Sequence, residues 1–264
     1  MKTLITRPKA KALELKKRLE AVGLEGVLCP VSEIILSKDP LQIGAVDALV
    51  VTSANAVTAL AIGGGEDDLY LDKPVYAVGE QTALALQDLG FKDCRTADGD
   101  VQSLLDLISQ NNHVGEHWAY LSGDPVKQDL ETPLKEQGIT LKRHIVYTAQ
   151  ACETLALDAK IELEKGQCDH VLFYSPRAVT LFKQLVEKEG LWKDAKRLRA
   201  ICLSANIGDE ARTHGFQEIW VAQDRNTDAL IHALKRSGQK GGDMMDDHEQ
   251  QQDQGPVCLL YTSD

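Results

Sequence analysis

The stretch Asp169-His-Val-Leu-Phe-Tyr-Ser-Pro-Arg-Ala-Val-Thr180 predicts a strand, a tight turn and a helix in direct succession. Val171 to Tyr174 form a short apolar run typical of a buried strand. Ser175 is a residue type that caps helix N-termini, and Pro176 suits the first helical position. Apolar residues then recur at helical spacing as far as Leu185. The helix therefore begins at the carboxyl end of a strand, the edge at which open α/β sheets bind ligands.

An earlier stretch repeats this pattern: Asp47-Ala-Leu-Val-Val-Thr-Ser-Ala-Asn-Ala-Val-Thr58. Asp, Ser, Ala, Val and Thr recur in it at a constant offset, and the regions 2–35 and 117–150 also match each other. Two copies of an alternating strand–helix set predict an α/β fold with two parallel sheets, each covered by helices on both faces. The repeat leaves open whether residues 1–35 pack with the first copy or the second.

The composition indicates a globular protein rather than a membrane or nucleic-acid-binding one. The chain has 264 residues, enough for two domains, and 43% of them are hydrophobic. Its N-terminus has too few apolar residues for a signal peptide, so we expect a first strand there. The net charge of −11 argues against nucleic acid but not against a small anion. The cysteines and histidines lack ligand spacing, so we expect reduced thiols in the cytoplasm and no metal site.

Six turns share the order strand, small polar residue or glycine, helix. They are Thr6-Arg7-Pro8, Thr52-Ser53-Ala54-Asn55, Gly79-Glu80-Gln81-Thr82, Ser122-Gly123-Asp124, Ser175-Pro176-Arg177 and Ser204-Ala205-Asn206. Any one of them is explained by the preference of Ser, Thr and Asn for N-caps. Their recurrence in two copies favours a ring of helix N-termini whose N–H groups and dipoles receive carboxylates or phosphates.

The sequence contains no dinucleotide-binding glycine motif, no Walker lysine and no nucleophile elbow. Gly63-Gly64-Gly65 follows a predicted helix, so we expect a C-cap or a loop there. Tyr147 lies in the segment that joins the two copies, where a phenol can reach a cleft, although packed strand tyrosines are commoner in this pattern. Residues 238–264 have no periodicity and are expected to be disordered, as a native end or a non-native extension.

These motifs, in this order and spacing, resemble the uroporphyrinogen-III synthase family, the cyclising lyases of tetrapyrrole and haem synthesis. The resemblance covers about residues 1–237. It rests on Leu4-Ile-Thr-Arg-Pro8, Val51-Thr-Ser-Ala-Asn-Ala-Val57, Ala77-Val-Gly-Glu-Gln-Thr-Ala83, Tyr120-Leu-Ser-Gly-Asp124, Val146-Tyr-Thr-Ala149, Phe173-Tyr-Ser-Pro-Arg-Ala-Val179 and Ser204-Ala-Asn-Ile-Gly208.

The resemblance implies two flavodoxin-like (HemD-type) α/β domains with a cleft between them. One domain would comprise residues 1–35 plus 152–237, and the other residues 38–143. A two-stranded antiparallel linker, residues 31–36 and 144–151, would join the two domains.

The substrate implied by the resemblance is hydroxymethylbilane, a linear tetrapyrrole with eight carboxylates. Loss of hydroxide gives an azafulvene cation, which attacks the substituted carbon of ring D. The spiro intermediate then fragments and recloses as uroporphyrinogen III, with ring D inverted, and no cofactor is expected. The resemblance also implies a cytoplasmic monomer that receives the bilane transiently from hydroxymethylbilane synthase, without a membrane or nucleic-acid partner.

By motif match, Tyr147 corresponds to the family's cleft tyrosine, a candidate proton donor to the leaving hydroxyl. Some family members carry threonines where Asn206 and Ile207 stand here, so a polar contact at 207 is not expected. The candidate substrate-binding residues are Arg7, Thr52, Ser53, Gly79, Gln81, Thr82, Ser122, Gly123, Ser175, Arg177, Ser204 and Asn206.

Two other functions are compatible with the residues. One is a two-domain binding protein or sensor that closes on an anionic ligand without chemistry. The other is a flavodoxin-like electron carrier, because Thr52-Ser-Ala-Asn-Ala-Val-Thr58 loosely resembles an FMN phosphate loop. The first would bind bilane and leave it linear, and the second would make the purified protein yellow.

Overall fold

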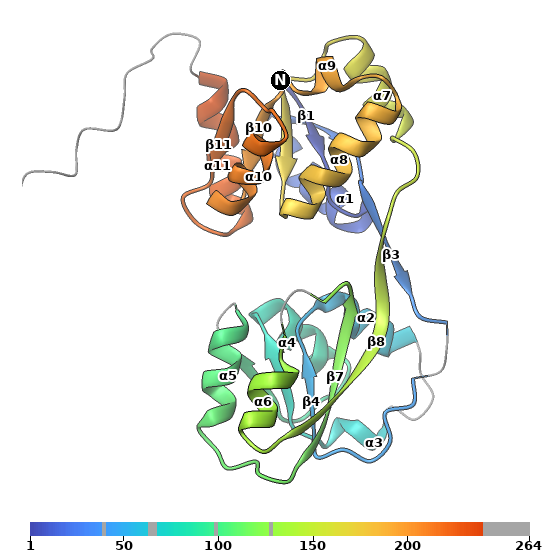
Figure 1. Ribbon diagram of the computed structural model, residues 1–264, viewed down its shortest axis with the longest axis vertical. Helices are drawn as coiled ribbons and strands as arrows, with labels where there is room; N and C mark the ends of the chain where they lie inside the picture. Colours follow the sequence, from blue (N-terminus) through green and yellow to red (C-terminus); the bar gives the residue numbers. More distant parts are fainter. Residues whose placement is uncertain (39–40, 63–67, 98–99, 127–128, 240–264) are drawn as a thin grey trace, which may run out of the picture.

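The computed structural model describes residues 1–38, 41–62, 68–97, 100–126 and 129–239 (Figure 1). The predictions for Gly63-Gly64-Gly65 and for residues 240–264 lie outside this part of the chain. Residues 238 and 239 are not disordered as expected, because helix α11 (Thr227–Gln239) continues through them.

One sheet, which we name sheet A, contains five parallel strands in the order β11-β10-β9-β1-β2. The N-terminal strand lies inside this sheet and places Thr3 opposite His170. The two N-terminal strands therefore share a sheet with the strands of the second sequence copy. The strands are β1 (Lys2–Ile5), β2 (Glu25–Leu28), β9 (His170–Phe173), β10 (Arg199–Cys202) and β11 (Ile219–Val221).

The second sheet, sheet B, has the strand order β3-β8-β7-β4-β5-β6. Its neighbours are parallel except for β3, which runs antiparallel to the outer end of β8, with Leu36 opposite Tyr147 and Ser32 opposite Ala151. Strand β8 thus pairs with β7 as far as Thr148 and with β3 from Tyr147 onward. The strands are β3 (Ser32–Leu36), β4 (Ala48–Val51), β5 (Val75–Val78), β6 (Cys94–Ala97), β7 (His117–Asp124) and β8 (Thr140–Ala151).

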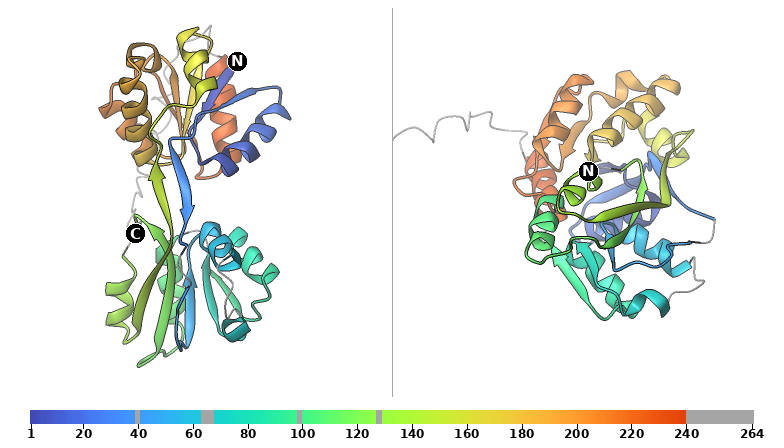
Figure 2. Two further views of the ribbon diagram at one scale, coloured as in Figure 1. Left: turned by 90° about the vertical axis from the view of Figure 1, so that its right-hand side faces the viewer. Right: turned by 60° about the horizontal axis from the view of Figure 1, so that its bottom comes forward.

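Helices cover both faces of each sheet, as the alternating sequence pattern predicts (Figures 1 and 2). No helix within the described residues is long and apolar enough to cross a membrane. The remaining helices are α1 (Lys9–Glu20), α2 (Ala54–Ile62), α3 (Asp68–Leu71), α4 (Glu80–Asp88), α5 (Val101–Ser109), α6 (Glu131–Glu136), α7 (Leu157–Glu164), α8 (Pro176–Lys188), α9 (Trp192–Ala195) and α10 (Ala205–Thr213).

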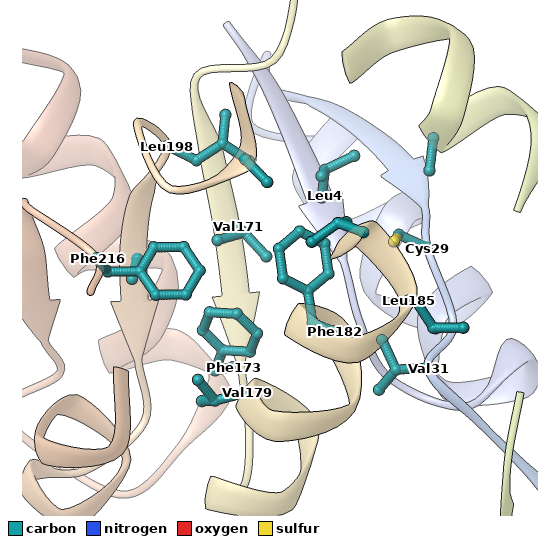
Figure 3. Close-up of a cluster of buried hydrophobic side chains, with 14 of the residues drawn as sticks. Leu4, Cys29, Val31, Val171, Phe173, Val179, Phe182, Leu185, Leu198 and Phe216 are labelled. Carbon is teal, nitrogen blue, oxygen red and sulfur yellow. The ribbon is translucent and has the colours of Figure 1, made fainter. Parts of the chain in front are cut away.

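The core of sheet A is built around aromatic residues (Figure 3). Phe173 of β9 meets Phe182 of α8 and Phe216, with ring centroids 5.7 and 5.5 Å away at steep interplanar angles. Edge-to-face pairs of this kind contribute about 0.5–1.5 kcal/mol beyond the burial of their area. They fix α8 on the sheet, so the start of α8 is held at the carboxyl end of β9.

Helix α1 buries a narrow stripe. The buried residues are Ala12, Leu15 and Leu19, whose spacing of three and four residues follows one side of the helix. Leu13 and Val22 are also apolar, but both are exposed. Leu13 lies two residues from Leu15, on another side of the helix, and Val22 follows the helix end.

The carboxyl ends of both sheets point toward the paired segment of β3 and β8. Strand β2 continues through residues 29–31 into β3, and β8 leaves the carboxyl edge of sheet B to pair with it. The other strands of sheet A run parallel to β2 and those of sheet B, apart from β3, run parallel to β8, so the carboxyl ends of the two sheets face each other across the paired segment (Figure 2). Asp100 lies at the start of α5, and hydrogen bonds from the N–H and hydroxyl of Ser103 lower the pKa of its carboxyl. Arg225, just before α11, lies close enough to Asp100 to lower this pKa further.

Candidate functional site

Tyr147 and Gly123 contact each other at the carboxyl edge of sheet B. They occupy paired positions on β8 and β7, just beyond a register shift at Ser122. A Cβ atom built on Gly123 would lie 2.3 Å from the ring carbons Cε2 and Cζ of Tyr147 and 2.7 Å from its Oη. Non-bonded carbons normally stay about 3.5–4.0 Å apart, so only glycine leaves room for the ring. The structure therefore brings together two residues that the sequence motifs indicated separately.

The prediction that Ser122-Gly123-Asp124 is a turn leading into a helix is wrong. Strand β7 continues through Asp124, and the next helix begins only at Glu131. The strand extends because β8 is long enough to pair with it as far as Thr148. The register shift leaves Val146 as an extra residue on β8, and such bulges redirect side chains near functional sites.

Arg143 of β8 belongs to the same cluster, although the sequence did not indicate it. Its Nε donates a hydrogen bond to Ser122 Oγ at 2.8 Å. Its Nη2 donates to the carbonyl oxygen of Gly123 at 2.8 Å and to Asp124 Oδ1 at 3.2 Å. The available signal was an arginine four residues before Tyr147 in a strand that follows a Ser-Gly-Asp motif. Arg143 thereby ties the end of β7 to β8.

Tyr120 is a second phenol that the sequence did not single out as a site residue. Its hydroxyl lies 3.0 Å from Thr52 Oγ1, at the end of β4. Burial raises the pKa of Tyr120, a rise that the Thr52 hydrogen bond and Arg143 oppose and Tyr147 strengthens. Tyr120 therefore stays protonated at neutral pH.

Two helices begin at the carboxyl edge of sheet B next to candidate residues. Ser53 Oγ accepts a hydrogen bond from the N–H of Asn55 at 3.2 Å, at the start of α2. Gly79 precedes α4 with a φ of 81°, a left-handed conformation that favours glycine. Gln81 is exposed, whereas Thr82 is buried within the first turn of α4. A substrate can therefore reach Gln81 more readily than the Thr82 side chain.

The remaining candidates lie at the carboxyl edge of sheet A. The Arg7 guanidinium lies 4.2 Å from the ring centroid of Tyr174, a cation–π contact. Burial raises the pKa of Tyr174, and Arg7 is among the groups that oppose this rise. Ser175 caps α8 as predicted, because its Oγ accepts from the N–H of Ala178 at 3.2 Å. Arg177, in the first turn of that helix, is exposed.

Ser204 and Asn206 form a local pair at the start of α10. Ser204 occupies the N-cap position, but its hydroxyl donates to Asn206 Oδ1 and does not accept a helix N–H. Ile207, where some members of the resembling family carry a threonine, is buried and offers no polar side chain.

The candidates form two groups rather than a continuous ring. Eight of them lie at the edge of sheet B and five at the edge of sheet A, and within the described residues no hydrogen bond or ion pair joins the groups. The described residues also contain no set of three His, Cys, Asp or Glu side chains arranged to hold a metal ion. The sheet B group is Thr52, Ser53, Gly79, Gln81, Thr82, Ser122, Gly123 and Tyr147, and the sheet A group is Arg7, Ser175, Arg177, Ser204 and Asn206.

Known protein structures share this fold. Uroporphyrinogen-III synthetase from Helicobacter pylori superposes with a TM-score of 0.60 at 19% identity, covering 90% of this chain and 99% of that one. A mutant uroporphyrinogen III synthase from Thermus thermophilus gives a TM-score of 0.56 at 18% identity, covering 91% and 99%. These two structures have the same fold as this chain.

Sequence relatives carry the same name. Uroporphyrinogen-III synthase of Escherichia coli is 27% identical over 249 residues, covering 89% of this chain and all of that protein. The enzyme of Salmonella typhimurium is 26% identical over 259 residues, with the same share of this chain and all of its own length. A family model described as uroporphyrinogen-III synthase HemD matches residues 14–232. Because this match spans most of the chain, the protein belongs to the uroporphyrinogen-III synthase family.

Proposed function

We propose that this chain is a lyase that cyclises hydroxymethylbilane to uroporphyrinogen III, with loss of water and inversion of ring D. The observation that carries the proposal is the contact between Tyr147 and Gly123 at the carboxyl edge of sheet B. This contact presents a phenol where α/β sheets bind ligands, in a chain of the synthase family.

The bilane binds between the two sheets, with its carboxylates at the helix N-termini that face each other. Helices α2 and α4 supply N-termini from sheet B, and α8 and α10 supply them from sheet A. The free N–H groups and the dipole of a helix N-terminus favour carboxylates. Within the sheet A group, Arg7 and Arg177 add positive charge, in a chain whose net charge is negative.

The two sheets are the cores of two domains that move about the linker. Residues 1–35 plus 152–237 form one domain and residues 38–143 the other, with residues 31–36 and 144–151 as the connection. The sharing of sheet A by β1, β2 and β9–β11 supports this division, as does the antiparallel pairing of β3 with β8. Opening and closing at the connection would admit the bilane and fold it around the cleft.

In this mechanism the Tyr147 phenol donates a proton to the terminal hydroxyl of the bilane, which leaves as water. The pyrrole nitrogen supplies the electron pair that expels the water, and the substituted carbon of ring D attacks the resulting azafulvene cation. The spiro intermediate fragments and recloses as the inverted macrocycle, and the proton released when the ring becomes aromatic again returns to the Tyr147 phenolate. The main task of the protein is to hold the bilane folded, so that ring closure at the unproductive carbon does not compete.

The reaction is tested with fresh hydroxymethylbilane and separation of the uroporphyrinogen isomers after oxidation. Spontaneous closure gives isomer I, so a predominance of isomer III establishes the reaction. Isomer I alone, from folded protein, would refute the proposal and favour a bilane-binding protein without catalysis.

The role of the phenol is tested by Tyr147→Phe, which we expect to lower turnover by roughly tenfold or more without unfolding the protein. Tyr70→Phe is the matched control, because the Tyr70 hydroxyl donates to the carbonyl oxygen of Gly44 and lies outside both groups of candidates. We expect this control to keep the turnover of the unmodified protein. Unchanged turnover in Tyr147→Phe would remove the proton-donor role.

We also propose a cytoplasmic monomer that takes the bilane from hydroxymethylbilane synthase in a transient contact. The location is in keeping with the cysteines of the described residues, Cys29, Cys94, Cys152, Cys168 and Cys202, none of which is paired in a disulfide there. Sedimentation of the purified protein, alone and with the synthase that precedes it, tests the monomer and the hand-over.

A further inference from the structure

The guanidinium of Arg143 holds three successive residues at the end of β7. It donates to the Ser122 hydroxyl, to the Gly123 carbonyl oxygen and to the Asp124 carboxylate, at 2.8, 2.8 and 3.2 Å. The Ser122 side chain is only 2% exposed, so without Arg143 its buried hydroxyl loses this partner. The planar fork of arginine makes several such bonds at fixed angles, which a lysine ammonium cannot reproduce.

One of these three residues, Gly123, contacts the Tyr147 ring. The register of the two strands shifts between Ser122 and Gly123, and Gly123 then lies opposite Tyr147. The ring approaches the Gly123 Cα more closely than any side chain at that position would allow. The bulge residue Val146 is buried in the core of sheet B, and its carbonyl oxygen accepts a hydrogen bond from the N–H of Ser37. The position of the ring therefore depends on where the Gly123 backbone is held.

We infer that Arg143 is a positioning residue for Tyr147, acting through the Ser122–Asp124 end of β7. This inference rests on the proposed function, in which Tyr147 donates the proton. Arg143 and Tyr147 both influence the pKa of Tyr120, which agrees with the three side chains forming one cluster. In this arrangement Arg143 contacts the protein and not the reacting atoms.

The first test reads the position of the Tyr147 ring and does not depend on catalysis. The chain contains six tyrosines, so a protein with ¹³C-labelled tyrosine rings gives few ring signals, and the Tyr147 signal is the one lost in Tyr147→Phe. We expect this signal to shift in Arg143→Met, which keeps the stem but removes the donors, and in Ser122→Ala, which removes one of the contacts. Arg212→Met is the control, since exposed Arg212 pairs with Asp209 on α10. An unmoved Tyr147 signal in folded Arg143→Met or Ser122→Ala would overturn the inference.

The second test is a double-mutant cycle in the isomer assay. We expect Arg143→Met to lower kcat by roughly three- to tenfold with little change in KM, but by less than about twofold in the Tyr147→Phe background. Arg143→Lys should not restore kcat, because it keeps the charge without the fork. Equal losses in both backgrounds, or a raised KM with unchanged kcat, would overturn the positioning role. If the unmodified protein yields only isomer I, the proposed function fails, and the ring signals still decide whether Arg143 positions Tyr147.

Discussion

Replacing Gly123 with alanine should disable the Tyr147 phenol without removing it. The new Cβ would lie 2.3 Å from two ring carbons. Since non-bonded carbons approach to about 3.5 Å, the ring has to retreat by about 1.2 Å. A displacement of about 1 Å at a reacting group is enough to cost roughly 100-fold, so the donor's contribution would be lost entirely. We therefore expect Gly123→Ala to lower kcat about as much as Tyr147→Phe does, by roughly tenfold.

The assay is the rate of isomer III formation from fresh hydroxymethylbilane, with thermal unfolding measured on the same preparations. Combining Gly123→Ala with Tyr147→Phe should lower kcat no further than either change alone, because both remove one function. Gly208→Ala is the matched control, since its added Cβ meets only two side-chain tips, Val221 Cγ2 at 3.1 Å and Ile219 Cγ2 at 3.4 Å, and alanine suits helix α10. A folded Gly123→Ala variant with the kcat of the unmodified protein would show that the ring position does not matter.

Two further predictions concern stability. Burial lowers the pKa of His170 to about 4, and within the described residues neither ring nitrogen has a hydrogen-bond partner. The unfolded chain, with a pKa near 6.5, therefore takes up the proton first, and about 3 kcal/mol of stability is lost as the pH falls from about 7 to about 4. In urea titrations the free energy of unfolding of His170→Leu should lack this pH-dependent loss. An equal fall between about pH 7 and about pH 4 in His170→Leu and in the unmodified protein would contradict the prediction. Ser175→Ala should lower the free energy of unfolding by about 1 kcal/mol, because it removes the cap on Ala178 N–H. Ser204→Ala should cost less, because the Ser204 hydroxyl caps no helix N–H, and equal losses would refute the distinction.

Local chemistry in the sequence was sufficient to predict the α8 unit. Ser175, Pro176 and the apolar residues of α8 are all within one strand–helix segment, and the structure has the strand, cap and helix as predicted. Apolar character alone does not decide burial, since Leu13 of α1 is exposed while Ala12 and Leu15 form the buried stripe.

The candidate site was less predictable because it depends on strand register. Tyr147 and Gly123 were found as members of family motifs, but nothing in the sequence states that their backbones are paired. The bulge at Val146 decides that pairing, whereas Arg143 is paired with Tyr120 before the bulge and reaches the end of β7 only through its long side chain. Ser122-Gly123-Asp124 has the composition of a turn, so its place inside a strand follows only from the length of β8.

The placement of β1 has a consequence for synthesis on the ribosome. Thr3 is made among the first residues, yet its partner His170 on one side follows only after sheet B has emerged in full. At about 5–20 residues per second the wait is roughly 10–30 s. During that time β1 and β2 can pair only with each other, and the apolar Leu4 and Ile5 lack the partners that later bury them. The strands of sheet B are contiguous in the chain, so sheet B can complete first. The nascent protein would then expose the apolar residues of β1 and β2, which chaperones can bind.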